Sequence, residues 1–236
     1  MTTSTDSRTT RVAIIDLGVN NLASIRRRVE DAGATSLEVL PEPESLDRFT
    51  HIVLPGVGAF AVAARVLHER DWTSALREVA DTSGTPVLGI CLGMQLLGDR
   101  SEEGEPVGGL GLVPGETVRM TPAAGERVPH VGWNEVTPTH SARLFTGVTP
   151  GADFYFVHSF VFLPAAPEDA TAHTPYAGGF VSAVQRGNIY GMQFHPEKSS
   201  AAGLQVLQNF IAVRSLDAQS PRHPDPAVER LRTGQG

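Results

Sequence analysis

The chain has 236 residues, of which 41% are hydrophobic and 19% charged, and its formal net charge is −7 at pH 7. This length favours one large α/β domain over two small ones. The acidic balance argues against a general nucleic-acid-binding protein, which carries a basic face, and no apolar run approaches the ~20 residues of a membrane span.

The polar start of the chain and its single cysteine indicate the cellular compartment, and the composition of both ends indicates the limits of the domain. Residues 1–10 lack the apolar segment of a secretory signal, and one cysteine cannot form an intrachain disulfide. A cytoplasmic protein is therefore expected. Residues 1–10 and the proline-containing segment 214–236 are predicted to be disordered, which leaves one domain over residues 11–213.

The first half of the chain alternates between predicted strands and predicted helices. Apolar runs indicate strands at residues 11–18, 35–40, 51–56 and 85–90. Apolar residues spaced three and four apart indicate one helix capped by Asn21 and another over 60–80, with Trp72, Leu76 and Val79 on one side. This alternation predicts a mainly parallel sheet flanked by helices.

The sequence after about residue 105 has a different texture, because glycine and proline become frequent. Short apolar runs at 153–160, 180–185 and 189–195 predict antiparallel strands. A closing helix is expected from Ala201 to Val213, with Leu204, Leu207 and Ile211 on one face. The predicted fold class is therefore α/β, with a mainly parallel sheet and an antiparallel C-terminal part.

The only cysteine lies in the pattern GICLG, residues 89–93, where an apolar run meets a predicted helix. A glycine-x-nucleophile-x-glycine turn is sharp, needs small neighbours, and holds the nucleophile at the edge of the sheet near a helix N-terminus. There the thiolate of Cys91 is favoured, and the Leu92 N–H can donate to an oxyanion. A buried structural cysteine is the competing interpretation, and this pattern alone leaves both open.

A cysteine nucleophile needs a general base, and that base needs a group that orients it. His195 follows a predicted strand, and Glu197 lies two residues farther along. An extended backbone held by Pro196 can point both side chains the same way. A lone histidine before proline is more often structural, but the elbow, His195 and Glu197 together favour a catalytic site.

The glycine-rich stretch PGVGAF, residues 55–60, follows the third predicted strand. Gly56 and Gly58 let the backbone approach a ligand, so an N–H of Val57 or Gly58 can supply a second oxyanion donor. A dinucleotide-binding G-x-G-x-x-A motif is the alternative. That motif does not follow the first strand here, and the acidic residues Glu69 and Asp71 are too near.

Five stretches together resemble a known family: PGVGAF, GICLGMQLL, PHVGWN, YFVHSF and GMQFHPEKS. The sequence is similar to class I glutamine amidotransferases over about residues 11–213, and within them most to the glutaminase subunits of imidazole glycerol phosphate synthases. The elbow and HPE mark the superfamily, whereas PHVGWN and FYFVHS are narrower. The resemblance implies a flavodoxin-like fold and hydrolysis of L-glutamine to glutamate and ammonia.

The resemblance also implies how the chemistry is divided. Cys91 would be the nucleophile, His195 the general acid and base, and Glu197 the residue that orients His195. The ammonia would pass to a cyclase subunit of (β/α)₈-barrel type, in a heterodimer that makes imidazole glycerol phosphate and an aminoimidazole carboxamide ribonucleotide. No cofactor, metal ion, nucleic acid or membrane is expected.

The remaining site residues come from the resemblance as well. The α-amino and carboxylate end of glutamine would be held by Gln95, Glu103 and the backbone around His158, Ser159 and Phe160. The cyclase would contact Trp133 and Lys198. The chain departs from the family pattern at Asn20–Asn21, where Gly-Asn is usual and asparagine best tolerates a left-handed backbone, and at Phe160, where tyrosine is common.

Two other interpretations stay open. A non-catalytic interaction subunit would keep the fold and lose turnover, which the presence of Cys91, His195 and Glu197 disfavours. A thiol α/β-hydrolase would place its acid between the nucleophile and the histidine, where Asp153 is a candidate. The HPE stretch makes such an acid unnecessary.

Overall fold

The computed structural model describes residues 9–18, 22–139 and 142–214. Asn20 and Asn21, with the helix cap and the loop departure predicted there, lie outside the described residues, as do the terminal segments 1–8 and 215–236. No helix within the described ranges is long and apolar enough to cross a membrane.

The main sheet has eight strands in the order β2-β1-β3-β4-β13-β12-β11-β8. The strands from β2 to β13 pair in parallel, whereas β12, β11 and β8 add antiparallel pairs. The bounds are β1 Arg11–Ile15, β2 Ser36–Leu40, β3 His51–Gly56, β4 Val87–Cys91, β8 Thr137–Pro138, β11 Ala170–Thr174, β12 Phe180–Arg186 and β13 Ile189–Met192. The predicted mainly parallel sheet with an antiparallel C-terminal part is confirmed.

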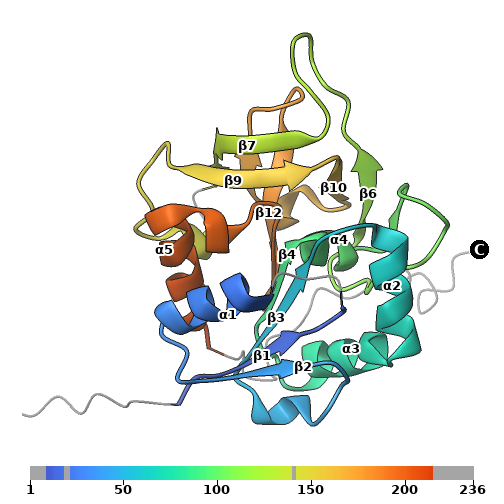
Figure 1. Cartoon of the computed structure of the whole chain (residues 1–236), viewed down its shortest axis with the longest axis vertical. Coiled ribbons are helices and arrows are strands. Elements are labelled where there is room, and N and C mark those ends of the chain that lie inside the picture. The colour runs from blue at the N-terminus through green and yellow to red at the C-terminus, as the bar shows by residue number, and fades with distance from the viewer. Residues whose placement is uncertain (1–8, 19–21, 140–141, 215–236) are drawn as a thin grey trace, which may run out of the picture.

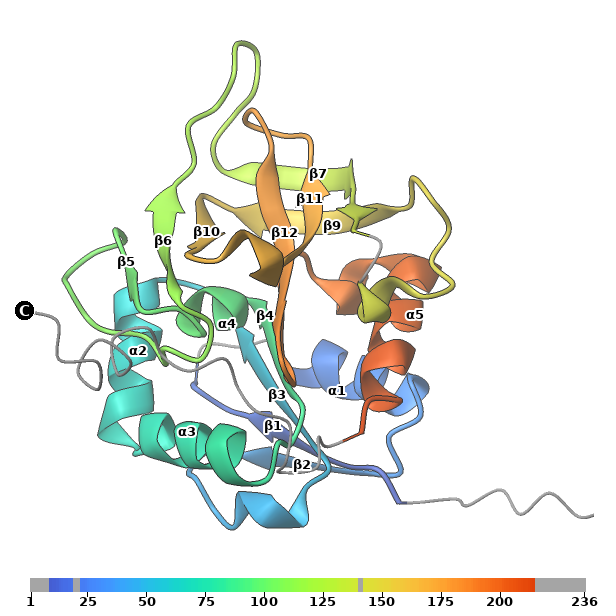
Figure 2. The same ribbon diagram turned by 180° about the vertical axis from the view of Figure 1, so that it is seen from behind.

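Helices cover both faces of this sheet (Figures 1 and 2). The helices α1 (Leu22–Asp31) and α5 (Ser200–Ile211) lie on one face, and α2 (Phe60–Glu69) and α3 (Trp72–Thr82) lie on the other. The sheet therefore separates two apolar cores, one containing Val29 and the other containing Leu67. The short helix α4 (Leu92–Leu96) follows β4 directly.

The segment 60–80 forms two helices rather than the single helix predicted. Asp71 adopts a left-handed backbone with φ 57°, which interrupts the right-handed turn between α2 and α3. Trp72, Leu76 and Val79 are buried on one side of α3, as predicted. The apolar spacing was therefore sufficient to identify the buried face but not the break before it.

The closing helix α5 is confirmed, but its predicted face is wrong in part. Its fully buried residues are Gly203, Val206, Leu207 and Phe210. Leu204 and Ile211 are only partly buried beside the same core. The helix is turned this way because Gly203 packs against the preceding turn, where a Cβ would come within 2.0 Å of the Pro196 carbonyl oxygen.

Two smaller sheets complete the fold. One contains β10 (Phe160–Pro164), β6 (Gly115–Arg119) and β5 (Arg100–Ser101), and the other pairs β7 (His130–Glu135) with β9 (Asp153–His158). Single 3-10 turns lie at Leu46–Arg48, Arg143–Phe145, Pro167–Asp169 and Pro196–Lys198. The β7–β9 pair lies beyond the upper ends of β3 and β4 in Figure 1, at the edge of the sheet where open α/β folds bind ligands.

Candidate active site

Cys91 is the last residue of β4 and immediately precedes α4. Its backbone has φ 55° and ψ −109°, a conformation that a non-glycine residue adopts only under strain. Such strain costs about 1–3 kcal/mol and gathers at functional positions. The residue is 5% exposed, so the surroundings both bury the thiol and hold it in this unfavourable turn.

The glycines beside Cys91 are required by close packing, as the elbow pattern predicts. A Cβ on Gly93 would lie 1.8 Å from the carbonyl oxygen of Leu54, and a Cβ on Gly89 would lie 2.5 Å from the carbonyl oxygen of Gly93. Both distances are far below van der Waals contact. The small neighbours therefore let α4 begin directly against β3, with Leu92 as its first residue.

His195 and Glu197 lie just beyond the end of β13, the strand next to β4. Nδ1 of His195 lies 2.8 Å from Oε1 of Glu197, and each side chain is 3% exposed. Because a carboxylate oxygen accepts, Nδ1 carries the proton of this bond. Nε2 is buried and has no hydrogen-bond partner in the part of the chain that the structure describes. It is the ring nitrogen left to exchange a proton with a reacting group.

The surroundings of His195 favour its protonated ring. Burial lowers the pKa of His195, but the neighbouring Cys91 sulfur and the Glu197 carboxylate bonded to Nδ1 outweigh burial and raise this pKa from 6.5 to about 10. A positive imidazolium beside the sulfur stabilises a thiolate, which is the nucleophilic form of cysteine. The geometry therefore places a positive imidazolium beside the sulfur of Cys91.

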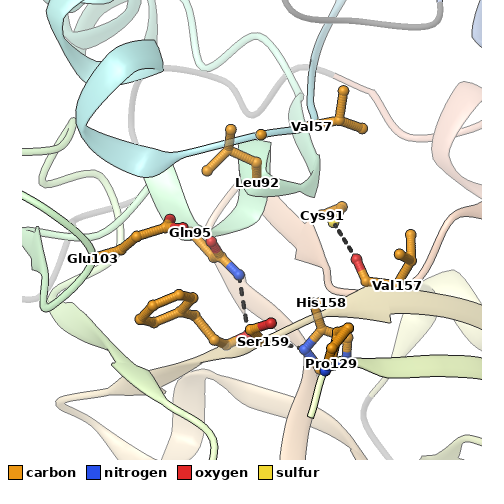
Figure 3. A pocket seen from close by; sticks show the side chains of 11 residues that line it. Val57, Cys91, Leu92, Gln95, Glu103, Pro129, Val157, His158 and Ser159 are labelled. Carbon is orange, nitrogen blue, oxygen red and sulfur yellow. Dashed lines mark hydrogen bonds between the residues drawn. The ribbon is translucent and has the colours of Figure 1, made fainter.

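A cavity of about 260 Å³ opens beside Cys91 (Figure 3). This volume suits a ligand of amino-acid size. Pro129 and Val157 line the cavity. So does every predicted oxyanion and substrate-binding residue: Val57, Gly58, Leu92, Gln95, Glu103, His158, Ser159 and Phe160. His195 and Glu197 do not line it; they border a much smaller hollow with Lys198.

Gln95 and Glu103 bring polar groups to the cavity from α4 and from the segment after β5. Nε2 of Gln95 donates to the carbonyl oxygen of Phe160 and to Oε1 of Gln193, at 3.1 Å each. With both amide hydrogens engaged, the carbonyl of Gln95 is the group left for a ligand. Oε2 of Glu103 accepts from the Phe60 amide at 2.8 Å, which fixes that carboxylate. Acceptors of this kind fit a ligand ammonium group.

His158 belongs to a directed chain of hydrogen bonds behind the cavity wall. Its Nδ1 lies 2.9 Å from the carbonyl oxygen of Phe160 and must donate, so its Nε2 accepts from Nδ1 of His130 at 3.0 Å. Nε2 of His130 in turn accepts from the Asn134 amide at 3.5 Å. Both ring nitrogens of His158 are therefore occupied, and both histidines are neutral in this arrangement.

The surroundings of His158 disfavour its protonated ring. Burial above all lowers the pKa of His158 to about 3; electrostatic interactions with the His130 and His195 rings add to this change, and the bond to the Phe160 carbonyl opposes it. Burial also lowers the pKa of His130. These rings are suited to hold the Phe160 carbonyl in place rather than to transfer a proton during turnover.

Val57 and Gly58 form the loop directly after β3. Gly58 has φ 101°, a backbone conformation that favours glycine. The loop lines the cavity together with Leu92 at the start of α4. The structure thus brings to one cavity the three residues predicted to supply oxyanion donors.

Trp133 and Lys198, the predicted contact residues for a partner subunit, both approach Tyr155. The ring centroids of Trp133 and Tyr155 are 6.0 Å apart, edge to face, and the Lys198 ammonium lies 5.4 Å from the centre of the Tyr155 ring. Trp133 is 52% exposed. Val131 and Val157 are also exposed and pair across the same two strands. We call Val131, Trp133, Tyr155 and Val157 the β7–β9 face.

Sequence reasoning missed two residues that the structure brings to the site. Gln193 contacts both Gln95 and the sulfur of Cys91, and His130 donates to His158. Each is a buried polar side chain, Gln193 directly after the apolar strand β13 and His130 at the start of β7. That polarity was the available signal. Among the described residues, no group of three or more histidine, cysteine or acidic side chains is placed to hold a metal ion.

Comparison with known proteins identifies the family. Residues 13–213 match the family described as glutamine amidotransferase class-I. The imidazole glycerol phosphate synthase subunit HisH of Moorella thermoacetica is 48% identical over 199 residues, which cover 84% of this chain and 93% of that protein. HisH of Archaeoglobus fulgidus is 42% identical over 202 residues, which cover 86% of this chain and 98% of that protein.

Solved structures share the fold at lower sequence identity. A glutamine amidotransferase superposes with a TM-score of 0.65 at 17% identity, covering 86% of this chain and 99% of that chain. The structure of PurLQS from Thermotoga maritima gives a TM-score of 0.63 at 18% identity, covering 86% and 98%. At such identity the likeness concerns the fold, and the predicted flavodoxin-like amidotransferase architecture is confirmed.

Proposed function

The chain belongs to the class-I glutamine amidotransferase family, and we propose that it is the glutaminase subunit of an imidazole glycerol phosphate synthase. It hydrolyses L-glutamine to glutamate and ammonia and passes the ammonia to a cyclase subunit of (β/α)₈-barrel type. One observation carries this proposal: the strained Cys91 ends β4 beside the His195–Glu197 pair that follows the adjacent β13.

The first half of the reaction begins from the thiolate–imidazolium pair. The sulfur of Cys91 attacks the side-chain amide carbon of glutamine, and the carbonyl oxygen becomes an oxyanion. The amide of Leu92 and an amide of the Val57–Gly58 loop donate hydrogen bonds to it; a lost donor costs about 10²–10³-fold in kcat in known cases. His195 then protonates the leaving nitrogen through Nε2, the C–N bond breaks, and ammonia departs, which leaves a glutamyl thioester on Cys91.

The second half regenerates the enzyme. Neutral His195 accepts a proton from water, which attacks the thioester carbon, and the C–S bond breaks to release glutamate and the thiolate. Glu197 holds the ring so that Nε2 faces the reaction throughout. Gln95 and Glu103 hold the α-amino group of glutamine, and the backbone of Ser159 and Phe160 holds its carboxylate. Phe160 acts through its backbone, so the missing tyrosine hydroxyl leaves this role intact.

The β7–β9 face is the proposed contact surface for the cyclase. Contiguous exposed apolar side chains mark protein–protein contacts, and Val157 connects this face to the thiol because its carbonyl oxygen lies 3.9 Å from Sγ of Cys91. Ammonia released at Cys91 therefore starts one peptide away from the partner. Trp133→Ala should weaken binding in a titration with the cyclase subunit and leave the melting temperature of the free chain almost unchanged; unchanged affinity would remove Trp133 from the interface.

Replacement of the nucleophile tests the function. Cys91→Ala in the assembled complex should abolish glutamine-dependent synthesis while the same complex retains synthesis driven by ammonium salts, because the cyclase chemistry lies on the other chain. The assay measures imidazole glycerol phosphate formed with each nitrogen source. Retained glutamine-dependent synthesis would exclude Cys91 as the nucleophile. A wild-type complex that uses ammonium alone would favour the non-catalytic interaction subunit instead.

A further inference from the structure

Gln193 links the substrate wall of the cavity to the nucleophile. Its Nε2 lies 3.6 Å from Sγ of Cys91, and its Oε1 accepts from Nε2 of Gln95 at 3.1 Å. The residue is 0% exposed. The mechanism described above does not use it, although it is the amide side chain that touches the sulfur.

The strand register explains why Gln193 lies at this position. The strands β13 and β4 run parallel with Met192 opposite Ile90, so Gln193 and Cys91 come level where the two strands end. On the other side of β4, Gly56 is opposite Cys91 and has no side chain to offer. Of the two residues flanking Cys91 in the sheet, Gln193 alone can contact the sulfur.

A polar residue at this position needs an explanation. Its neighbours along the chain, Met192 and Phe194, are fully buried and apolar, so a polar side chain stands out in this stretch. An amide buried without partners is strongly unfavourable. Both ends of the Gln193 amide are hydrogen-bonded, and both bonds lead to site residues. The buried amide of Gln193 is therefore satisfied by the nucleophile and by a substrate-binding residue.

The orientation of this amide is set from the substrate side. Gln95 donates one amide hydrogen to the Phe160 carbonyl and the other to Gln193. The oxygen of Gln193 must therefore face Gln95, which turns its N–H toward the sulfur. An N–H that donates to an anion stabilises it, whereas a carbonyl in the same place would repel it.

We infer that Gln193 is a positioning residue of this reaction: it donates to the Cys91 thiolate in an orientation that Gln95 imposes. The residue that binds the amino end of the substrate thereby also fixes the hydrogen bond at the nucleophile. A role in catalysis rests on the proposed function, whereas the hydrogen bond and its effect on thiol reactivity are tested without turnover.

The test measures alkylation of Cys91 by iodoacetamide in the full-length chain, without glutamine. Cys91 is the only cysteine, so mass spectrometry of the intact chain reports on it directly. Gln193→Met removes the donor, and Gln193→Glu keeps an acceptor for Gln95 while removing the amide donor. Each should slow alkylation about tenfold at neutral pH, because a hydrogen bond to a charged group is lost. The exposed Gln208→Glu is the matched control and should alkylate at the wild-type rate.

A pH series separates the hydrogen bond from altered access to the sulfur. Gln193→Met leaves unchanged the titratable groups around Cys91, namely His195 with Glu197, His158 and Glu103, whereas Gln193→Glu adds a carboxyl beside the sulfur, so the pH series uses Gln193→Met. Its deficit should shrink toward the wild-type rate at about pH 10, where a thiol is ionised without help. Wild-type rates at neutral pH, or a deficit of equal size at all pH values, would overturn the inference.

A double-mutant cycle tests the link to Gln95. Gln95→Met should slow alkylation about threefold by releasing the Gln193 amide, and adding it to Gln193→Met should cause no further loss. Additive losses would show that Gln95 does not act through Gln193. Because alkylation requires no turnover, these results stand whether or not the chain proves to be a glutaminase.

Discussion

Two buried histidines lie near the same thiol and are held in opposite protonation states. Interactions with Cys91 and Glu197 overcome burial and raise the pKa of His195 to about 10, whereas burial lowers the pKa of His158 to about 3. Both residues are almost fully enclosed. The difference therefore comes from the neighbours of each ring rather than from the depth at which it is buried.

The hydrogen-bond partners explain the contrast atom by atom. His195 has a carboxylate on Nδ1 and an unpartnered Nε2 among the described residues. His158 has a carbonyl on Nδ1 and another neutral histidine on Nε2. One ring is therefore poised to give and take a proton, and the other is locked as a support. A histidine near a nucleophile is a base only when one of its nitrogens is left for the reaction.

Replacing each histidine in turn by asparagine should give the largest difference between the two residues. His195→Asn removes both the acid for the departing ammonia and the base for water, so kcat for glutamine hydrolysis should fall at least ~10³-fold. His158→Asn should lower kcat far less. Steady-state ammonia release by the assembled complex measures both variants, and a larger loss with His158→Asn would reverse the two assignments.

Neutralising the carboxylate partner should sharpen the comparison with an intermediate effect. Glu197→Gln keeps an acceptor oxygen for Nδ1 of His195 but removes the negative charge that favours the imidazolium. We expect kcat to fall about 10²-fold, less than in His195→Asn, because proton transfer is impaired rather than deleted. The same ammonia assay applies. A loss as severe as that of His195→Asn would mean that Glu197 does more than orient and charge the ring.

Removing the hydrogen bond from His130 to His158 should have the smallest effect, and it should change KM rather than kcat. His130→Phe keeps the stacking on Tyr176, whose ring centroid is 4.0 Å away, but removes the donor to Nε2 of His158. The wall at Phe160 should loosen, which raises KM for glutamine about fivefold to tenfold and leaves kcat within about twofold, in the range of one lost hydrogen bond. A selective fall in kcat would place this chain in the proton transfer instead.

Most features that could be predicted from the sequence depend on residues close together along the chain. The pattern around Cys91 predicted a strained turn with small neighbours, and the distances at Gly89 and Gly93 confirm why. The alternation of apolar runs and amphipathic helices predicted the parallel sheet. His195 and Glu197 are two residues apart and make the predicted contact, but the predicted extended backbone was wrong, because Pro196–Lys198 forms a 3-10 turn that brings Glu197 back to the ring.

What the sequence could not predict depends on register between distant strands. Gln193 and Cys91 are 102 residues apart, and only the pairing of β13 with β4 brings them level. The contact between His130 and His158 likewise depends on the pairing of β7 with β9. The ranking of His195 above His158 came from the resemblance, since no residue spacing shows which ring nitrogens will be occupied.

Direct titration of the histidine rings tests the central claim, that their neighbours hold His195 and His158 in opposite states. Nitrogen-15 NMR of the histidine-labelled, full-length chain resolves both ring nitrogens, with His195→Asn and His158→Asn to assign the signals. His195 should remain an imidazolium up to about pH 10. His158 should remain neutral, protonated on Nδ1, at about pH 5, where an unperturbed histidine is charged. If both rings instead titrate together near the ordinary pKa of 6.5, the account is contradicted.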